Sequence, residues 1–235
     1  MTERVTLEIR DHVALVTLNR PEKMNAVDIA MFDALIDTAE KIAADLSLRA
    51  VVLAGAGGNF CAGIDTSVFR NMQGEGAISG HGRMQPRANS PANYFQSAAY
   101  VWAALPIPVI AALQGNVFGA GLQIAAGADI RYAHPAASLS IMEIKWGLIP
   151  DMAISVCLRN IVPLDRLREL AYSGRILNGN EAMQAGLVTA VKPDPLASAI
   201  EFAGAVAQKS PDAIRSVKTL TNEGWSRPVA ESLKL

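Results

Sequence analysis

Near its middle the chain reads Ile110-Ala-Ala-Leu-Gln-Gly-Asn-Val-Phe-Gly-Ala-Gly-Leu-Gln123. This stretch begins inside an apolar segment, Val109–Leu113, whose side chains predict a buried strand. Its three glycines then predict a turn, and the residues up to about Ala126 predict a helix. An apolar strand that leads through a glycine-rich turn into a helix is typical of an α/β fold, in which helices cross over a sheet.

A second strand and turn of the same kind lie earlier in the chain. An apolar run at residues 50–54 leads into Gly55-Ala-Gly-Gly-Asn-Phe-Cys-Ala-Gly-Ile-Asp65, after which we expect a short helix. A turn that opens a helix leaves backbone N–H groups without partners. Two such turns on neighbouring strands could aim two N–H groups at one oxygen atom, which would form an oxyanion hole. For either turn alone, close packing of a helix against a strand is an adequate explanation.

Apolar periodicity predicts the remaining elements. The expected strands are a half-buried one at residues 5–9 and others at 12–18, 129–133, 137–141 and near 187–191. The expected helices run from Asp28, as N-cap, to Asp45, from Tyr94 to Ala104, and from Pro150 to about Ile161, with a mostly helical remainder. Residues 71–93 are rich in glycine and polar residues and predict a long loop.

The composition excludes several classes of protein. The chain has 235 residues, 51% of them apolar, which excludes intrinsic disorder. Its formal net charge is −1 and no basic run is present, so a nucleic-acid-binding surface is not favoured. No segment has the continuous apolarity of a membrane span, and the start of the chain lacks a signal-like apolar region. Two cysteines are too few for a disulfide framework, so we expect a cytoplasmic protein.

Motifs for other common chemistries are weak or missing. The run Gly55-Ala-Gly-Gly-Asn-Phe60 starts like a dinucleotide-binding fingerprint, but Phe60 stands where the last glycine belongs. The sequence has no Gly-Lys-Ser or Gly-Lys-Thr of a P-loop and no Gly-x-Ser-x-Gly of a hydrolase. Cys61 has no histidine near it in sequence, which favours a buried thiol over a nucleophile.

Two carboxylates and one amide are candidates for the site. Glu143 stands among apolar neighbours, which would raise its pKa and suit proton transfer, although pairing with Arg131 or Lys145 would also explain it. Asp151 follows a proline and is explained by helix capping. Gln123, in the helix after the second turn, can form hydrogen bonds but cannot act as an acid or a base.

Together these segments resemble the crotonase superfamily, the enoyl-CoA hydratase/isomerase family. Five segments carry the resemblance in order: Asn19-Arg-Pro-Glu-Lys-Met-Asn-Ala26, Asn59-Phe-Cys-Ala-Gly-Ile-Asp65, residues 110–123, residues 138–150, and Gly179-Asn-Glu-Ala-Met-Gln-Ala-Gly-Leu-Val188. The resemblance implies an α/β spiral of ββα units at residues 1–191 and a C-terminal helical trimerisation region at residues 192–235. Members of the family usually continue past this point, so a truncated C-terminus is one reading of the chain.

The resemblance also implies the ligand and the residues that bind it. The substrate would be an acyl-CoA thioester, with no tightly bound cofactor and no metal. The N–H groups of Ala62 and Ala120 would hold the thioester oxygen as an oxyanion hole. Contacts with coenzyme A or the acyl group would come from Lys23, Met24, Ala62, Gly63, Ile64 and Asp65. Residues 71–93 would line or cover the acyl pocket. The implied assembly is a homo-oligomer, a trimer or a hexamer, without nucleic acid or membrane.

The departures from the family pattern guide the choice of reaction. Hydratases that resemble this chain carry two glutamates, of which the second matches Glu143 and the first falls on Gln123. Asp151 falls where dienoyl-CoA isomerases keep an aspartate. We expect Glu143 to transfer the proton, Asp151 to assist or orient it, and Gln123 to position the thioester or a water. This predicts an isomerase that shifts a double bond through an enolate; the alternatives are an enoyl-CoA hydratase and a CoA-ester-binding homologue with little catalysis.

Overall fold

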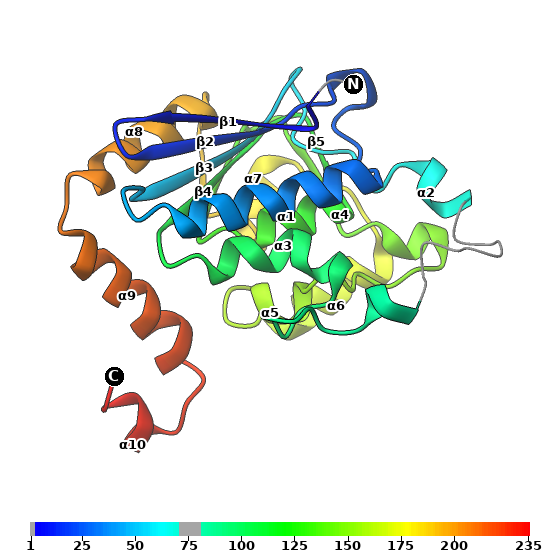
Figure 1. Ribbon diagram of the computed structural model, residues 1–235. Coiled ribbons are helices and arrows are strands. Elements are labelled where there is room, and N and C mark those ends of the chain that lie inside the picture. Colours follow the sequence, from blue (N-terminus) through cyan, green and yellow to red (C-terminus); the bar gives the residue numbers. More distant parts are fainter. Residues whose placement is uncertain (1–2, 71–80) are drawn as a thin grey trace.

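The computed structural model describes residues 3–70 and 81–235, which form a sheet with helices on both faces (Figure 1). Within those residues the main sheet has six strands in the order β1-β2-β3-β4-β6-β8, with β1 and β2 antiparallel and the other pairs parallel. The strands are β1 (Val5–Arg10), β2 (Val13–Leu18), β3 (Ala50–Gly55), β4 (Val109–Leu113), β6 (Ile130–Ala133) and β8 (Ala190–Val191). The α/β fold class expected from the sequence is confirmed.

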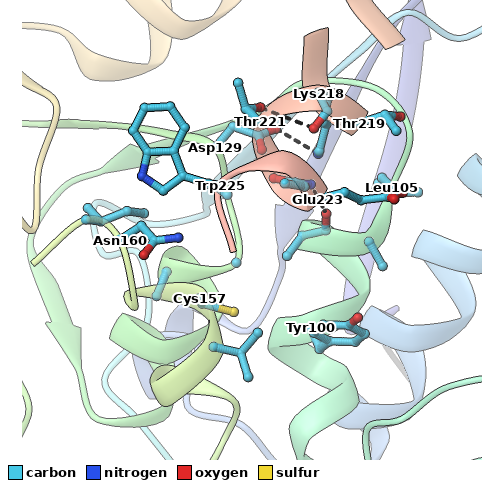
Figure 2. A pocket seen from close by; sticks show the side chains of 18 of the residues that line it. Tyr100, Leu105, Asp129, Cys157, Asn160, Lys218, Thr219, Thr221, Glu223 and Trp225 are labelled. Carbon is cyan, nitrogen blue, oxygen red and sulfur yellow. Dashed lines mark hydrogen bonds and ion pairs between the residues drawn. The ribbon is translucent and has the colours of Figure 1, made fainter. Parts of the chain in front are cut away.

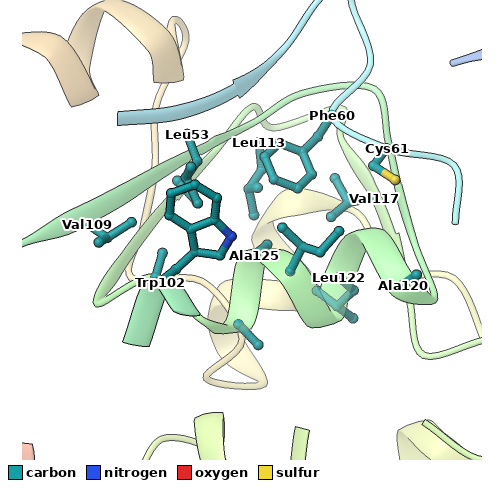
Figure 3. Close-up of a cluster of buried hydrophobic side chains, with 14 of the residues drawn as sticks. Leu53, Phe60, Cys61, Trp102, Val109, Leu113, Val117, Ala120, Leu122 and Ala125 are labelled. Atoms are coloured by element: carbon teal, nitrogen blue, oxygen red, sulfur yellow. The ribbon is translucent and has the colours of Figure 1, made fainter. Parts of the chain in front are cut away.

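The central strands are buried on both faces, and different helices cover the two faces. In β3, Val51 and Leu53 belong to the core beneath α1 (Ile29–Ala44) and α3 (Tyr94–Ala104), where Trp102 is fully buried (Figure 3). The alternate residues Ala50 and Val52 pack against α8 (Pro195–Ala207). Burial on both faces explains why these strands are continuously apolar in sequence.

A small second sheet joins the two glycine-rich turns. It consists of β5 (Asn116–Phe118) and β7 (Ser138–Ser140), which pair in parallel. Single bridges extend it, because Cys61 of the first turn pairs with Val117 and Ile64 pairs with Val27. The sequence does not predict β5, since this strand is short and lies inside the glycine-rich stretch. Its pairing places the two turns side by side.

The helices begin close to the expected residues, with one exception. Asp28 caps α1 by accepting the N–H of Met31 at 2.8 Å, as expected. The helix expected from Pro150 to about Ile161 is wrong, because α5 covers only Ile154–Cys157. Ala153, at a φ of 64°, adopts the left-handed conformation that no residue inside an α-helix adopts. The other helices are α2 (Thr66–Arg70), α4 (Ala120–Ala126), α6 (Leu164–Ser173) and α7 (Gly179–Gln184).

The C-terminal helices α8, α9 (Pro211–Gly224) and α10 (Val229–Ser232) have different surroundings. Although α8 falls within the region assigned above to oligomerisation, it covers one face of the sheet. In contrast, α9 and α10 lie to the side of the layered body (Figure 1). Lys218 anchors α9, because its buried Nζ lies 2.8 Å from Asp129 and donates to the carbonyl of Ile107. Among the described residues, no helix is long and apolar enough to cross a membrane.

Candidate active site

A pocket of about 160 Å³ lies where the two glycine-rich turns meet. Its walls come from the first turn, the start of α4 and a short 3₁₀ helix, Glu143–Trp146, that follows β7. The lining residues are Ala62, Gly63, Ile64, Thr66, Gly119, Ala120, Met142, Glu143, Trp146 and Leu148. Residues 71–80 of the loop expected to cover this pocket lie outside the described residues.

The prediction that the N–H of Ala62 in the first turn binds the oxyanion is wrong. Ala62 donates its N–H to the carbonyl of Met24 at 2.9 Å, so this group is not available to a ligand. The N–H of Ile64, two residues later, has no acceptor among the described residues, while both of its neighbours donate to protein atoms. Because Ile64 also lines the pocket, it takes the place that we expected for Ala62.

The second turn places Ala120 as expected. Gly119 precedes α4 at a φ of 50° and donates its N–H to the carbonyl of Ser140. Ala120 is the first residue of α4, and its N–H has no acceptor in the described part of the chain. It lines the same pocket as Ile64, so two N–H groups without protein partners border one cavity. The start of a helix adds positive potential there.

Glu143 supplies the carboxylate of the pocket. Its Oε1 accepts a hydrogen bond of 2.6 Å from Nε2 of Gln123, and its Oε2 is buried without a hydrogen-bond partner among the described residues. Burial raises the pKa of Glu143 and the charge of Asp151 raises it further, whereas the backbone N–H of Glu143 itself and the hydrogen bond from Gln123 lower it. A buried carboxyl with a raised pKa suits proton transfer near neutral pH.

The simpler explanation for a carboxylate at position 143, an ion pair with Arg131 or Lys145, is wrong. Glu143 forms no ion pair with any residue that the structure describes. Arg131 is buried elsewhere and donates to the carbonyls of Ala128 and Leu187. Capping by Asp151 is also wrong, since Ala153 stands at the cap position of α5. Asp151 is exposed outside the lining of the pocket, close enough for its charge to act on Glu143.

The expected coenzyme A contacts are divided between the pocket and its surroundings. Gly63 lines the pocket, whereas Lys23 and Met24 are exposed and lie outside its lining. The carboxylate of Asp65 pairs with Arg20 at 2.6 Å instead of facing the cavity. The N–H and the hydroxyl of Ser67, followed by the Arg20 guanidinium, lower the pKa of Asp65 to about 2. Asp65 therefore braces the first turn.

Asn25 is a supporting residue that the sequence does not single out. It is fully buried, and its Oδ1 accepts the N–H of Arg20 while its Nδ2 donates to the carbonyls of Ala56 and Asn59. These bonds fix the loop after β3 to the segment before α1. The signal in the sequence is the polar Asn25 between the apolar neighbours Met24, Ala26 and Val27.

A larger hollow of about 690 Å³ lies between the ends of α3 and α4, α5 and α9 (Figure 2). Lys218 and Asp129 in its wall are already paired with each other. Burial raises the pKa of Cys157 to about 11, so this thiol stays protonated at neutral pH. Because Glu143 and the free N–H groups lie in the smaller pocket, we assign the chemistry to that pocket.

Comparisons with known proteins identify the family of the chain. The family model for enoyl-CoA hydratase/isomerase matches residues 8–235. Human mitochondrial Delta(3,5)-Delta(2,4)-dienoyl-CoA isomerase is 34% identical to this chain over 98% of the chain and 71% of the isomerase. The enoyl-CoA hydratase EchA19 of Mycobacterium tuberculosis is 31% identical, over 97% of this chain and 84% of the hydratase.

The fold is similar to solved structures over almost the same length. The crystal structure of an enoyl-CoA hydratase from Bacillus anthracis matches 98% of this chain and 87% of its own, with a TM-score of 0.87 and 28% identity. The chain therefore resembles these enzymes in sequence and in fold over nearly its whole length. Because the family model matches almost the whole chain, and the human isomerase and EchA19 are more than 30% identical to it, the chain belongs to the enoyl-CoA hydratase/isomerase family.

Proposed function

We propose that this enzyme shifts a double bond of an enoyl-CoA or dienoyl-CoA thioester. Glu143 removes a proton from Cα or Cγ and returns it to the other carbon, while the N–H groups of Ile64 and Ala120 hold the enolate oxygen. The single observation that supports this proposal is the contact between Glu143 and Gln123, which supplies one carboxylate and one amide to the site.

An amide at position 123 favours isomerisation over hydration. A double-bond shift needs one group that accepts a proton and gives it back. Water addition needs one group to activate the water and a second group to protonate carbon, and an amide does neither. The absence of a proton-transfer group typically slows a reaction by about 10²–10⁴-fold. Among the described residues that line the pocket, Glu143 is the one whose side chain can exchange a proton near neutral pH.

The two N–H groups have an electrostatic role in this reaction. Removal of a proton next to a thioester moves negative charge onto its oxygen. Donors that already point at that position stabilise the charge without rearrangement, and one such donor is typically worth about 10²–10³ in kcat. We propose that Ile64 and Ala120 are these donors, and that Lys23, Met24 and Gly63 contact coenzyme A at the mouth of the pocket.

The remaining proposals concern Asp151 and the assembly. The charge of Asp151 helps to keep the pKa of Glu143 raised, so we propose that Asp151 tunes the base. We also propose a homo-oligomer, trimer or hexamer. Large exposed apolar side chains after the 3₁₀ helix, on α6 and on or directly after α9 support it, namely Ile149, Leu164, Tyr172, Val217, Leu220 and Trp225.

Incubation with trans-2-, cis-3- and 3,5-dienoyl-CoA in deuterated water, followed by mass spectrometry, tests the proposed reaction. We expect an isomer of unchanged composition that carries deuterium at the α or γ carbon. A gain of one water molecule would instead identify a hydratase. If none of the three thioesters changes, the proposal is wrong, and binding of CoA esters becomes the activity to measure.

A further inference from the structure

Both polar atoms of the Gln123 side chain are engaged within the protein. The residue lies in α4 and is 2% exposed. Its Oε1 accepts the backbone N–H of Met152 at 2.7 Å, and its Nε2 donates to Oε1 of Glu143 at 2.6 Å. A backbone N–H can only donate, so the amide oxygen must face Met152. The amide nitrogen must therefore face Glu143.

This arrangement makes the two oxygens of Glu143 different. Oε1 accepts the short hydrogen bond from Gln123, and such a bond lowers the basicity of the oxygen that accepts it. Oε2 is buried and has no partner in the described part of the chain. Oε2 is consequently the stronger base of the two, and it is the oxygen of Glu143 without a competing hydrogen bond among the described residues.

We propose that Gln123 is a positioning residue, which holds Glu143 through Oε1 so that Oε2 alone exchanges a proton with the substrate. The inference rests on the proposed function, in which Glu143 is the base. In the forward step the C–H bond breaks, its electron pair enters the enolate, and the proton binds Oε2. In the return step the Oε2–H bond breaks and the proton binds the other carbon. No co-reactant is needed.

The turn before α5 holds the Gln123 side chain through its amide oxygen. Ala153 adopts a left-handed backbone conformation directly after Met152, at the point where the chain turns into α5. Such a conformation is unfavourable for alanine and persists only where the surrounding structure holds it. The left-handed Ala153 directly follows Met152, whose N–H donates to Oε1 of Gln123. Gln123 thereby connects the 3₁₀ helix of Glu143 to the turn that carries Asp151.

Each amide atom already bonds a protein group, and the role predicted from the sequence, in which Gln123 binds the thioester or a water, is not supported by its position. Gln123 is also absent from the lining of the pocket. Its effect on the reaction must therefore pass through Glu143. A residue that acts in this way should affect the titration of the base and kcat, and should leave KM largely unchanged.

Two substitutions separate positioning from simple support of the fold. Q123L removes both hydrogen bonds. Q123E keeps an acceptor for Met152 and places a second carboxyl group against Oε1 of Glu143. Two carboxyl groups in such contact share one proton, which keeps the site at the net charge of the native pair. While that proton is present, the new carboxyl group donates to Glu143 as the amide does; when it leaves at higher pH, the two charges repel.

The test measures isomerisation of cis-3-hexenoyl-CoA between about pH 6 and pH 9 for the wild type, Q123L, Q123E and Q184L. Gln184 is exposed at the end of α7, so Q184L controls for loss of a glutamine. We expect Q123L to lose about tenfold or more in kcat at every pH, with KM within about twofold. Q123E should approach the wild type at low pH and lose activity at high pH. Equal losses in Q123L and Q123E at all pH values, or no loss in Q123L, would overturn the proposal.

A measurement without substrate keeps this inference distinct from the proposed function. Carbon-13 NMR of protein labelled at the glutamate carboxyl carbons follows the titration of Glu143, whose signal is assigned from its absence in E143Q. Q123L removes a donor to the charged form, so the pKa of Glu143 should rise. If the wild type turns over no enoyl-CoA, the proposed function fails while the titration still tests the inference. An unchanged titration in folded Q123L would exclude the positioning role.

Discussion

Gly121 and Cys61 lie so close together that a Cβ atom added to Gly121 would stand 2.5 Å from the Cys61 carbonyl oxygen. Gly121 follows Ala120 at the start of α4, and Cys61 stands three residues before Ile64 in the first turn. This contact sets the distance between the two turns. The spacing of the two free N–H groups therefore depends on the absence of a side chain at position 121.

The substitution G121A should separate the two turns. Overpacking of this kind typically costs about 1–3 kcal/mol of stability, and displacement of a catalytic donor by about 1 Å costs about 100-fold in kcat. Steady-state kinetics and thermal unfolding measure the two effects. G204A on α8 is the control, because nothing lies within 4 Å of a Cβ at Gly204 and alanine favours a helix. Wild-type kinetics in G121A would contradict the role given to this contact.

The substitution E143Q should abolish proton exchange while the thioester still binds. Glutamine keeps the shape and accepts the hydrogen bond from Gln123, but it cannot take a proton. We expect kcat to fall by about 10²–10⁴-fold or more. Deuterium incorporation into the substrate reports the exchange, and calorimetric titration with a CoA ester reports binding. E169Q is the control, since Glu169 is exposed and pairs with Arg175 outside the pocket. Unchanged exchange in E143Q would remove Glu143 as the base.

The same substitution should stabilise the protein at neutral pH. Burial raises the pKa of Glu143, so the folded state holds this proton at pH values where the unfolded state has lost it. Wild-type stability therefore falls as the pH rises from the unfolded-state pKa of about 4.3 through the raised folded value. Below that pH window the carboxyl is protonated in both states, and its raised pKa does not lower the stability of the folded state.

Thermal unfolding of the wild type and E143Q from acidic to neutral pH measures this cost. The difference in Tm should be small at low pH, grow through the window and then stay constant. Activity should show the opposite dependence, because the reaction needs the charged carboxylate and declines as the pH falls through the raised pKa. A Tm difference that is independent of pH would mean that burial of this charge is not the cause.

The substitution Q123E should also give the site a second proton-transfer group. Crotonyl-CoA then has one carboxyl group to activate a water and another to protonate carbon. We expect a product that is one water molecule heavier, detected by mass spectrometry, in Q123E and not in Q123L. If neither variant adds water, more than this one group separates the site from that of a hydratase.

The ion pair between Lys218 and Asp129 should be important for the position of α9. K218M keeps the apolar stem but removes the charge and the hydrogen bond to Ile107. Since Asp129 is partly exposed, we expect a loss of about 2 kcal/mol, less than for a fully buried pair. Urea denaturation measures this loss. K209M is the control at an exposed position, and an equal effect of both substitutions would contradict the role of the pair.

The main sheet and its helices could be predicted because their signals are local. Val109–Leu113 is apolar at every position, and Asp28 stands directly before an amphipathic helix. The true start of the helix after Pro150 could not be predicted from the sequence. Its true start depends on the left-handed Ala153, and the preference of alanine for a helix gives no sign of that conformation. Tertiary packing overrides local preference there.

The sequence indicates which residues form the candidate site, but it does not show which of their atoms already have hydrogen-bond partners. Glu143 and Ala120 line the pocket, and Gln123 is hydrogen-bonded to Glu143 without lining it. The prediction that the N–H of Ala62 is the donor of the first turn is wrong, because a sequence does not show which N–H in a turn already has an acceptor. Here the carbonyl of Met24, far from Ala62 along the chain, decides it. The same reason hides the bond between Gln123 and Met152.

The position of α8 has a consequence for synthesis of the chain. This helix covers Ala50, Val52 and Ile110, yet it begins only at Pro195. During translation, the apolar face of β3 and β4 stays exposed while about 80 residues between the end of β4 and the start of α8 are synthesised. At about 5–20 residues per second this synthesis takes several seconds. Nascent chains that lack α8 therefore expose a surface that chaperones bind, and ribosome-stalled chains ending before Pro195 should associate with them more than chains ending after Ala207.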